Sequence, residues 1–357
     1  MILVCGIRTE TSIVRLVRAL EELGAAWFML NQRLVAASSI ETWITDEGEV
    51  EGTLEHDGHR LRLSEIDGVY LRFMDDRFLP EVRHEPPESR ARQHSRAFHD
   101  LVPQWAEVAQ ARVINRYSAM ASNYSKPYQL QLIAEQGFSV PETLITNEPE
   151  RVLAFRAEHG RLIYKSISSE RSIVAELDDE DLARLDRIRW CPVQFQAYVD
   201  GDDVRVHTIG PRAFATRVTT SATDYRYARR QTGHEADFTP FQLSDELTER
   251  CAALGASLGL DMAGIDLRIT PEGEAYCLEV NPSPVYSYYE AQTGQPMALA
   301  VAEYLMGRSE SLTTNHRPDP APDLAEPGDR RRGDSSTDGS ITADTKPAAD
   351  ATGVGTG

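Results

Sequence analysis

The segment that most constrains the fold is a predicted β-hairpin, MAGIDLRITPEGEAYCLEVNPSP, at residues 262–284. Its two apolar arms flank a turn at Pro271–Gly273, which is typical of paired strands. Glu279 and Asn281 stand two residues apart on the second arm, so both project to the same side, and Pro282 then ends the pairing. A buried carboxylate is costly unless a positive group meets it, so this arm predicts an arginine, a lysine or a metal ion beside Glu279.

The hairpin also predicts a metal site. Its first arm carries Asp266, which a hairpin of this length brings close to Glu279 and Asn281. Two carboxylates and one amide oxygen make a set of hard oxygen ligands, which Mg²⁺ uses when phosphates complete its coordination. The spacing leaves a structural alternative open, in which an arginine such as Arg268 pairs with the carboxylates.

Two lysines are candidate phosphate ligands. Lys165 is at the centre of the apolar strand LIYKSI, and a Ser-rich run from Ser166 to Ser172 follows it. A lysine in an apolar strand is seldom buried without a partner. One interpretation is that Lys165 binds a phosphate, and the other is that its side chain extends its charge into solvent. Lys126, at a helix start beside a proline, is uninformative by itself.

Aspartates and arginines cluster around the next strand, in VQFQAYVDGDDVRVHTIG at residues 193–210. This strand leads into Asp202 and Asp203, and Arg205 lies on the strand that follows. A further arginine, Arg226, is in SATDYRYARR. In an acidic chain these guanidinium groups suit an anionic ligand, because they match phosphate or carboxylate oxygens in pairs. Charges exposed on loops are the alternative.

The order of predicted elements divides the chain into three parts. A strand (MILVCGI), a helix (TSIVRLVRALEELG) and a strand (AAWFMLN) predict a parallel α/β domain at residues 1–115, without the G-x-G-x-x-G dinucleotide fingerprint. Residues 116–307 form a second unit, in which CPVQFQAYVDG, DVRVHTIG and RAFATRVTT are expected to make one antiparallel series. Residues 308–357 are rich in Pro, Gly, Asp, Ser and Ala, which predicts a disordered tail.

Composition excludes several classes of partner. The 357 residues carry a formal net charge of −19, which argues against a general affinity for nucleic acid. The sequence shows no membrane-spanning segment and no signal peptide. Its four cysteines lack C-x-x-C spacing, which is typical of reduced thiols in a cytoplasmic protein. P-loop, nucleophile-elbow and H-E-x-x-H motifs are absent.

Taken in order, these segments resemble the ATP-grasp superfamily. The resemblance covers about residues 115 to 305 and is carried by SNYSKPYQLQLIAEQGFSVPETLIT, LIYKSI, QFQAYVDGDDVRV, TDYRYA and the ending AGIDLRI…YCLEVNPSP. Within the superfamily the chain looks most like the RimK-type glutamate ligases and the microviridin-type peptide ligases, also called graspetide ligases. This resemblance implies an α/β (α+β) ATP-grasp fold. The α/β domain would precede it, with a nucleotide-binding lid at about residues 141–200 and a metal-binding subdomain at about 201–307.

The resemblance also implies roles for individual residues. Lys126 and Lys165 would contact ATP phosphates. The strand segment of Gln196, Ala197, Tyr198 and Val199 would offer backbone groups to the adenine, and Asp203 would lie near the ribose. Arg205 and Arg226 would contact phosphates or the acceptor carboxylate and are the candidate catalytic residues. The implied metal ligands are Asp266, Glu279 and Asn281, with Mg²⁺ as the ion and Mn²⁺ as its alternative. The chain departs from the family at SISSERS, where a Gly-rich loop is usual, and at Ala197, where glutamate is frequent.

The implied function is that of an enzyme, an ATP-dependent carboxylate–amine ligase that forms an amide bond through an acyl phosphate on an amino acid or peptide. Three alternatives stay open. One is a graspetide-type macrocyclase that joins side chains of a precursor peptide by ester or amide bonds, and another is a nucleotide-binding regulatory protein without turnover. The third is an interaction protein whose acidic tail recruits a partner. The expected partner is a small-molecule or peptide substrate, without nucleic acid or membrane, and a homo-oligomer is compatible with this picture.

Two further segments are candidates for the substrate side. In VYLRFMDDRF, four charged residues either lie at the edge of the expected cleft or form a structural ion-pair cluster: Arg72, Asp75, Asp76 and Arg77. In PVYSYYEAQTGQP, three tyrosines either shape an acceptor pocket or pack the last helix: Tyr286, Tyr288 and Tyr289.

Overall fold

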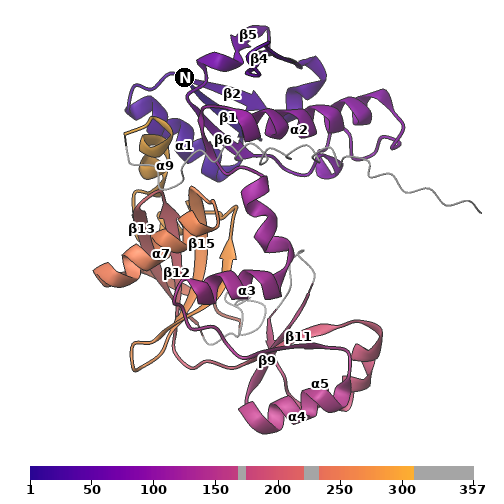
Figure 1. Cartoon of the computed structure of the whole chain (residues 1–357), viewed down its shortest axis with the longest axis vertical. Helices are drawn as coiled ribbons and strands as arrows, with labels where there is room; N and C mark the ends of the chain where they lie inside the picture. The colour runs from indigo at the N-terminus through magenta and orange to yellow at the C-terminus, as the bar shows by residue number, and fades with distance from the viewer. Residues whose placement is uncertain (168–173, 221–232, 309–357) are drawn as a thin grey trace, which may run out of the picture. The chain divides into compact units, whose positions relative to one another are not determined.

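The computed structural model describes residues 1–167, 174–220 and 233–308. It begins with a parallel sheet of strand order β2-β1-β6-β7, shown at the top of Figure 1. These strands are β1 (Ile2–Gly6), β2 (Trp27–Asn31), β6 (Gly68–Arg72) and β7 (Arg112–Ile114), and the sheet confirms the predicted parallel α/β start. The predicted tail at residues 308–357 lies, apart from its first residue, outside the described part.

Helices cover both faces of this sheet. Ile2 and Val4 of β1 pack with α1 (Thr11–Glu22), whereas Leu3 and Cys5 pack with α2 (Arg90–Val108). Every residue of β1 is buried, as expected of a parallel strand that is covered on both sides.

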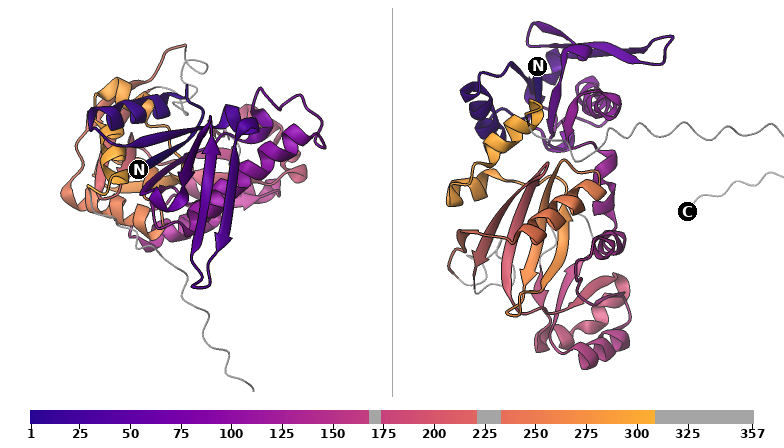
Figure 2. Two further views of the ribbon diagram at one scale, coloured as in Figure 1. Left: turned by 90° about the horizontal axis from the view of Figure 1, so that it is seen from above. Right: turned by 60° about the vertical axis from the view of Figure 1, so that its left-hand side comes forward.

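A small antiparallel sheet of order β3-β4-β5 lies next to α2 in Figure 2. It consists of β3 (Ser39–Ile44), β4 (Val50–His56) and β5 (His59–Arg62). Asp57 and Gly58, at the turn between β4 and β5, both have positive φ, at 50° and 75°, as tight hairpin turns require. Strand β3 was not predicted, because its side chains are mostly exposed and show no alternation of apolar and polar residues.

His56 makes the stability of this region depend on pH. Its Nε2 accepts a hydrogen bond from Asn31 N–H (3.1 Å), so Nδ1 carries the proton and donates to Ser38 Oγ (2.6 Å). Burial lowers the pKa of the His56 imidazole, although the Asp57 carboxylate opposes this shift. As pH falls below about 6.5, the unfolded chain therefore binds a proton that the folded chain refuses.

We expect the free energy of unfolding to decrease between about pH 7 and pH 5, and a His56→Gln substitution to flatten that slope. Urea unfolding at several pH values measures it. The exposed neighbour His59 supplies the matched control, since His59→Gln should keep the full slope. Equal slopes in the wild type and His56→Gln would show that His56 does not cause the effect.

The second sheet is antiparallel, with strand order β10-β9-β11-β8. Its strands are β8 (Thr143–Thr146), β9 (Leu162–Ser166), β10 (Ala175–Glu176) and β11 (Val193–Ala197). Helices α4 (Pro149–His159) and α5 (Asp179–Ala183) lie on one side of it in Figure 1. Its core includes Val152, Leu162 and Phe195, so the alternate residues of β9 and β11 face the other side.

The third sheet is antiparallel and has the order β14-β13-β12-β15-β16. Its strands are β12 (Asp202–Ile209), β13 (Arg212–Thr219), β14 (Asp237–Phe241), β15 (Met262–Ile269) and β16 (Ala275–Asn281). Helix α7 (Asp245–Ser257) packs on it, and α3 (Lys126–Glu135) lies along β16. The β15–β16 pair confirms the predicted hairpin.

The remaining helices are α8 (Ser287–Thr293), α9 (Met297–Leu305) and five short 3₁₀ helices among the described residues, η1 (Gln32–Ala37), η2 (Leu63–Glu65), η3 (Asp76–Phe78), η4 (Ser118–Tyr124) and η5 (Leu185–Trp190). Helix α9 packs against α1.

The prediction of one antiparallel series through β11, β12 and β13 is wrong. Strand β11 pairs with β8 and β9, whereas β12 pairs with β13 and β15. The chain changes sheet at Gly201, whose φ is 146° and whose added Cβ would lie 2.2 Å from the carbonyl oxygen of Ile269. Alternation along a strand identifies the strand but not its partner, so the sequence pattern did not separate the two sheets.

Candidate functional site

A cavity of about 660 Å³ is lined by β9 and β11 of the second sheet and by β12, β15 and β16 of the third. Most of the residues singled out in the sequence line it: Lys165, Gln196, Ala197, Tyr198, Val199, Asp203, Arg205, Asp266, Glu279 and Asn281. Lys126 reaches the same place through an ion pair with Glu279. Arg226 and most of SISSERS lie outside the described residues.

The two carboxylates stand directly opposite each other, because the register of β15 and β16 pairs Asp266 with Glu279. Like charges in this position are destabilising unless cations neutralise them. Arg205 Nη1 lies 2.7 Å from Asp266 Oδ1, and Lys126 and Lys165 lie 2.5 Å and 3.9 Å from the Glu279 carboxylate. Burial alone would raise the pKa of Glu279, but the charges of the two lysines outweigh it and lower that pKa overall.

The expected alternative partner for the carboxylates, Arg268, is engaged elsewhere. Its Nη2 lies 2.9 Å from Asp203 Oδ1, so Arg268 pairs with the candidate ribose ligand. The arginine that pairs with Asp266 is Arg205.

The oxygen set fits a shared magnesium site. Among the described residues, no three His, Cys, Asp or Glu side chains gather as a metal site of their own. Two carboxylates and the Asn281 amide therefore provide fewer ligands than a protein-only site needs. They fit an ion that takes its other oxygens from phosphate and water, which is the usual arrangement for Mg²⁺.

Gln129 fixes the distance between Lys126 and Glu279. Its buried carboxamide donates to the carbonyl oxygen of Val280 (2.9 Å) and accepts from Val280 N–H (3.0 Å). Strand β16 is an edge strand of its sheet, so Gln129 satisfies backbone groups that have no neighbouring strand. Helix α3 is thereby bonded to the strand that carries Glu279, and sequence reasoning missed this residue.

We expect Gln129→Met to lower turnover by about tenfold or more, because an ångström-scale shift of Lys126 misplaces its charge. It should also lower the Tm, since Val280 is left with two unpaired backbone groups. The matched control is Gln32→Met, which removes a similar pair of bonds to Met74 far along the chain. If both variants lose Tm and neither loses turnover, Gln129 has no positioning role.

Glycine at position 264 makes room for Arg205. A Cβ built on Gly264 would lie 2.1 Å from Arg205 Nη2 and 2.7 Å from Pro284 Cβ. The Arg205 guanidinium therefore crosses directly over this point of β15, with the side chain buried. The glycine allows Arg205 to reach Asp266.

The expected adenine segment is fixed by its surroundings. Gln196 Nε2 donates to Thr143 Oγ1 (3.0 Å), and the N–H groups of Ala197 and Tyr198 donate to the carbonyl oxygens of Glu142 and Arg161 (both 2.9 Å). The Tyr198 ring also contacts the guanidinium groups of Arg161 and Arg268, at 3.7 Å and 5.5 Å from its centroid. The Ala197 N–H is thus already committed, and a ligand would have to use other groups of this segment.

The substrate-side candidates divide into two groups. Tyr288 and Tyr289 line the cavity together with Phe238, and the three rings are nearly perpendicular to one another. Tyr286 instead is buried and donates its hydroxyl to the carbonyl oxygen of Ser12 (2.7 Å), so it packs the helices.

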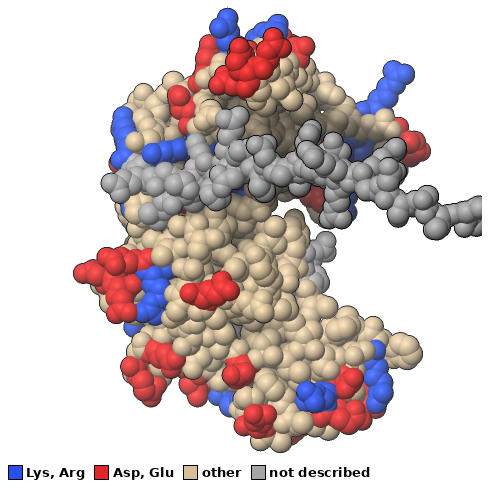
Figure 3. All heavy atoms as spheres, in the orientation of Figure 1, with Lys and Arg blue, Asp and Glu red and all other residues tan. Residues whose placement is uncertain are grey.

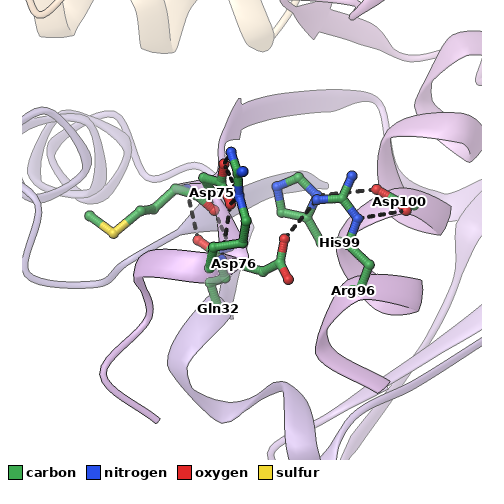
Figure 4. A network of polar contacts seen from close by, with 8 residues as sticks. Gln32, Asp75, Asp76, Arg96, His99 and Asp100 are labelled. Atoms are coloured by element: carbon green, nitrogen blue, oxygen red, sulfur yellow. Dashed lines mark hydrogen bonds and ion pairs between the residues drawn. The ribbon is translucent and has the colours of Figure 1, made fainter. Parts of the chain in front are cut away.

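The charged residues of VYLRFMDDRF mostly form the structural cluster. Figure 4 shows Arg96 between Asp76 and Asp100, and Asp75 pairs with Arg77. Arg72 differs, because its guanidinium donates to the carbonyl oxygen of Pro284 (3.3 Å), close after Asn281 in the chain.

The comparison with known proteins identifies the family. A family model for the RimK-like ATP-grasp domain matches residues 123–305. The chain belongs to this family. It is 24% identical over 213 residues to a probable α-L-glutamate ligase of Photobacterium profundum, covering 57% of this chain and 70% of that one. It is 27% identical over 211 residues to the α-aminoadipate–LysW ligase LysX of Sulfurisphaera tokodaii, covering 56% and 72%.

Two solved structures of ligases have the same fold as this chain. The ATP-grasp ligase PsnB, complexed with a variant of its minimal precursor, Mg and ADP, matches with a TM-score of 0.69 and 24% identity, covering 87% of this chain and 98% of that one. The macrocyclase MdnC of Microcystis aeruginosa, bound with precursor peptide MdnA, matches with a TM-score of 0.69 and 20% identity, covering 87% and 100%. The predicted ATP-grasp fold, the ligase class and the use of ATP and magnesium are confirmed at the level of the family.

Figure 3 shows how charged side chains are distributed on one face of the molecule. On the face drawn in Figure 3, basic and acidic side chains of the described residues are interspersed, and no continuous basic stripe is seen there. No helix in the described part is long and apolar enough to cross a membrane.

Proposed function

We propose that the cavity binds ATP with magnesium, transfers the γ-phosphoryl group to a carboxylate, and joins the resulting acyl phosphate to an amine of a peptide substrate. One observation carries this proposal: Asp266 and Glu279 face each other in the cavity while three cations, Lys126, Lys165 and Arg205, converge on them. Three positive charges against two negative ones favour an anionic ligand at this point.

The charge arrangement suggests an exchange of partners. Without ligand, the cations neutralise the carboxylates. When ATP binds, Asp266, Glu279 and Asn281 would hold Mg²⁺, and Lys126, Lys165 and Arg205 would turn to phosphate oxygens. Magnesium supplies neutralisation of the charge that spreads over the transferring phosphoryl group.

The remaining steps are positioning. Arg205 would hold the acceptor carboxylate or the transferring phosphate, because a guanidinium matches either group with two parallel bonds. Gln196, Ala197, Tyr198 and Val199 would place the adenine, and Asp203 the ribose. For Arg226 the proposal rests on the sequence resemblance. No covalent bond to the protein is required, which agrees with the absence of a nucleophile motif in the sequence.

The peptides bound in the similar structures favour a peptide as substrate. PsnB and MdnC were solved with their precursors, and each covers 87% of this chain, which extends beyond residues 123–305 of the family match. We therefore include the first 115 residues in the proposed enzyme, as the α/β domain that precedes the lid (about 141–200) and the metal-binding part (about 201–307). A macrocyclase that joins side chains within one precursor peptide is the second candidate, for the same reason.

Two finer points belong to this proposal. A cytoplasmic location is supported by the thiols of Cys5, Cys251 and Cys277, which are free and buried. The proposal also includes a homo-oligomer, and light scattering on the purified chain would test it by measuring the molecular mass in solution.

The chemistry is tested by measuring ADP and phosphate release with a panel of amino acids and short peptides that contain Glu, Asp, Lys or Thr. Hydroxylamine should capture the acyl phosphate as a hydroxamate in the presence of the correct carboxylate. Release of AMP and pyrophosphate instead would contradict the acyl-phosphate route. Product masses separate the two candidates, because a macrocyclase removes one water per bond from a single peptide, whereas a ligase joins two molecules.

A further inference from the structure

One buried polar side chain, next to residues that line the cavity, has no assigned role. Gln194 lies on β11, between β8 and β9, directly opposite Lys165. Its neighbour Phe195 points into the apolar core, so Gln194 projects to the opposite face, together with Gln196. Lys165 and Gln196 on that face line the cavity.

The Gln194 carboxamide is buried without a partner. Its exposed fraction is 1%, and neither Nε2 nor Oε1 has a hydrogen bond. The other buried glutamines in the described part of the chain, Gln32, Gln129 and Gln196, all make hydrogen bonds. A buried amide without a hydrogen bond destabilises the folded chain, and a bound ligand that forms hydrogen bonds with it would remove this cost.

The two unpaired atoms restrict the chemistry of that ligand. Nε2 is a donor and Oε1 an acceptor, so a phosphate or carboxylate oxygen would satisfy only one of them. A ligand that presents an acceptor and a donor side by side satisfies both. The N7 atom and the 6-amino group of adenine form such a pair, and a glutamine carboxamide matches them with two bonds.

We propose that Gln194 is a nucleotide-binding residue whose carboxamide donates to N7 and accepts from the 6-amino group of adenine. This inference rests on the proposed binding of ATP in the cavity. Guanine offers acceptors at both positions, so it leaves Oε1 unpaired. Gln194 thereby selects adenine nucleotides over guanine nucleotides.

The test is calorimetric titration of ADP and GDP, both with magnesium, into the wild type and Gln194→Met. ADP should bind the variant about tenfold more weakly, whereas GDP should change by less than about twofold. The ligand-free variant should keep or raise its Tm, because an apolar side chain replaces an unpaired amide. The matched control Gln32→Met, whose amide is bonded to the Met74 backbone as Figure 4 shows around Gln32, should lose Tm and keep its ADP affinity.

A second measurement changes the ligand, and its first part needs the wild type alone. The wild type should bind 7-deaza-ADP more weakly than ADP, because the analogue lacks N7, whereas Gln194→Met should bind the two equally. Unchanged ADP affinity in Gln194→Met, or equal losses of ADP and GDP, overturns the assignment. A wild type that binds no nucleotide overturns the proposed function itself and this inference with it.

Discussion

Glu279→Gln is expected to reduce turnover by roughly a thousandfold or more while leaving the fold intact. The substitution keeps the shape of the side chain and removes its charge. The proposed magnesium ion then loses one of two carboxylate ligands, and Lys126 and Lys165 lose their common partner. Initial rates of ADP formation, together with magnesium-dependent ADP affinity, measure both consequences.

A surface carboxylate supplies the control for this variant. Glu303 pairs with Arg212 at 2.5 Å on a partly exposed site away from the cavity lining. Glu303→Gln should leave turnover within about twofold, because exposed ion pairs contribute little. Comparable turnover in Glu279→Gln and Glu303→Gln would contradict the metal assignment.

Gly264→Ala is expected to lower kcat/KM by roughly a hundredfold through displacement of Arg205. The added methyl group would occupy the position where the guanidinium crosses β15, and Pro284 blocks it on another side. Arg205 then leaves Asp266, so the proposed acceptor site loses its cation. Steady-state kinetics would report the loss, and a crystal structure of the variant would show the moved side chain.

A second buried glycine tests whether the effect is specific. Gly255 lies in α7, where an added Cβ would come no nearer than 3.2 Å to the flexible Thr208 hydroxyl. Gly255→Ala should keep kcat/KM within about twofold, since alanine suits a helix interior. Normal activity in Gly264→Ala would mean that Arg205 has no part in the reaction.

The sequence was sufficient to predict the β15–β16 hairpin, which carries the proposed metal ligands. The spacing of side chains along one strand determines which of them share a face, and it can be read from the sequence. Such a spacing relates Glu279 to Asn281, and Pro282 marks the end of the strand. The same reasoning placed Asp266 near the second arm, but it did not predict the register shift between Asp266 and Leu267. That β-bulge sets Asp266 opposite Glu279. Lys165 was marked by its apolar surroundings.

The residues that position the site were beyond such reasoning. Gln129 bonds a backbone 151 positions away, and Gly264 matters only because Arg205 of another strand crosses it. Gln194 and Gln196 lie on the same face of β11, but Gln194 lacks the hydrogen bonds that Gln196 makes, and residue spacing does not reveal this difference. Each of these features depends on which strands and helices pack together, and the sequence pattern does not reveal this pairing. The wrong prediction of one antiparallel series through β11, β12 and β13 has the same cause.

The central claim, that this cavity binds ATP through magnesium, is tested most directly by calorimetric titration of a non-hydrolysable ATP analogue into the wild type. The titration is run once in Mg²⁺ and once in EDTA. The proposed site predicts saturable binding in Mg²⁺ that weakens by about tenfold or more in EDTA, since the ion links the phosphates to Asp266 and Glu279. Equal affinity under both conditions, or no binding in either, would contradict it.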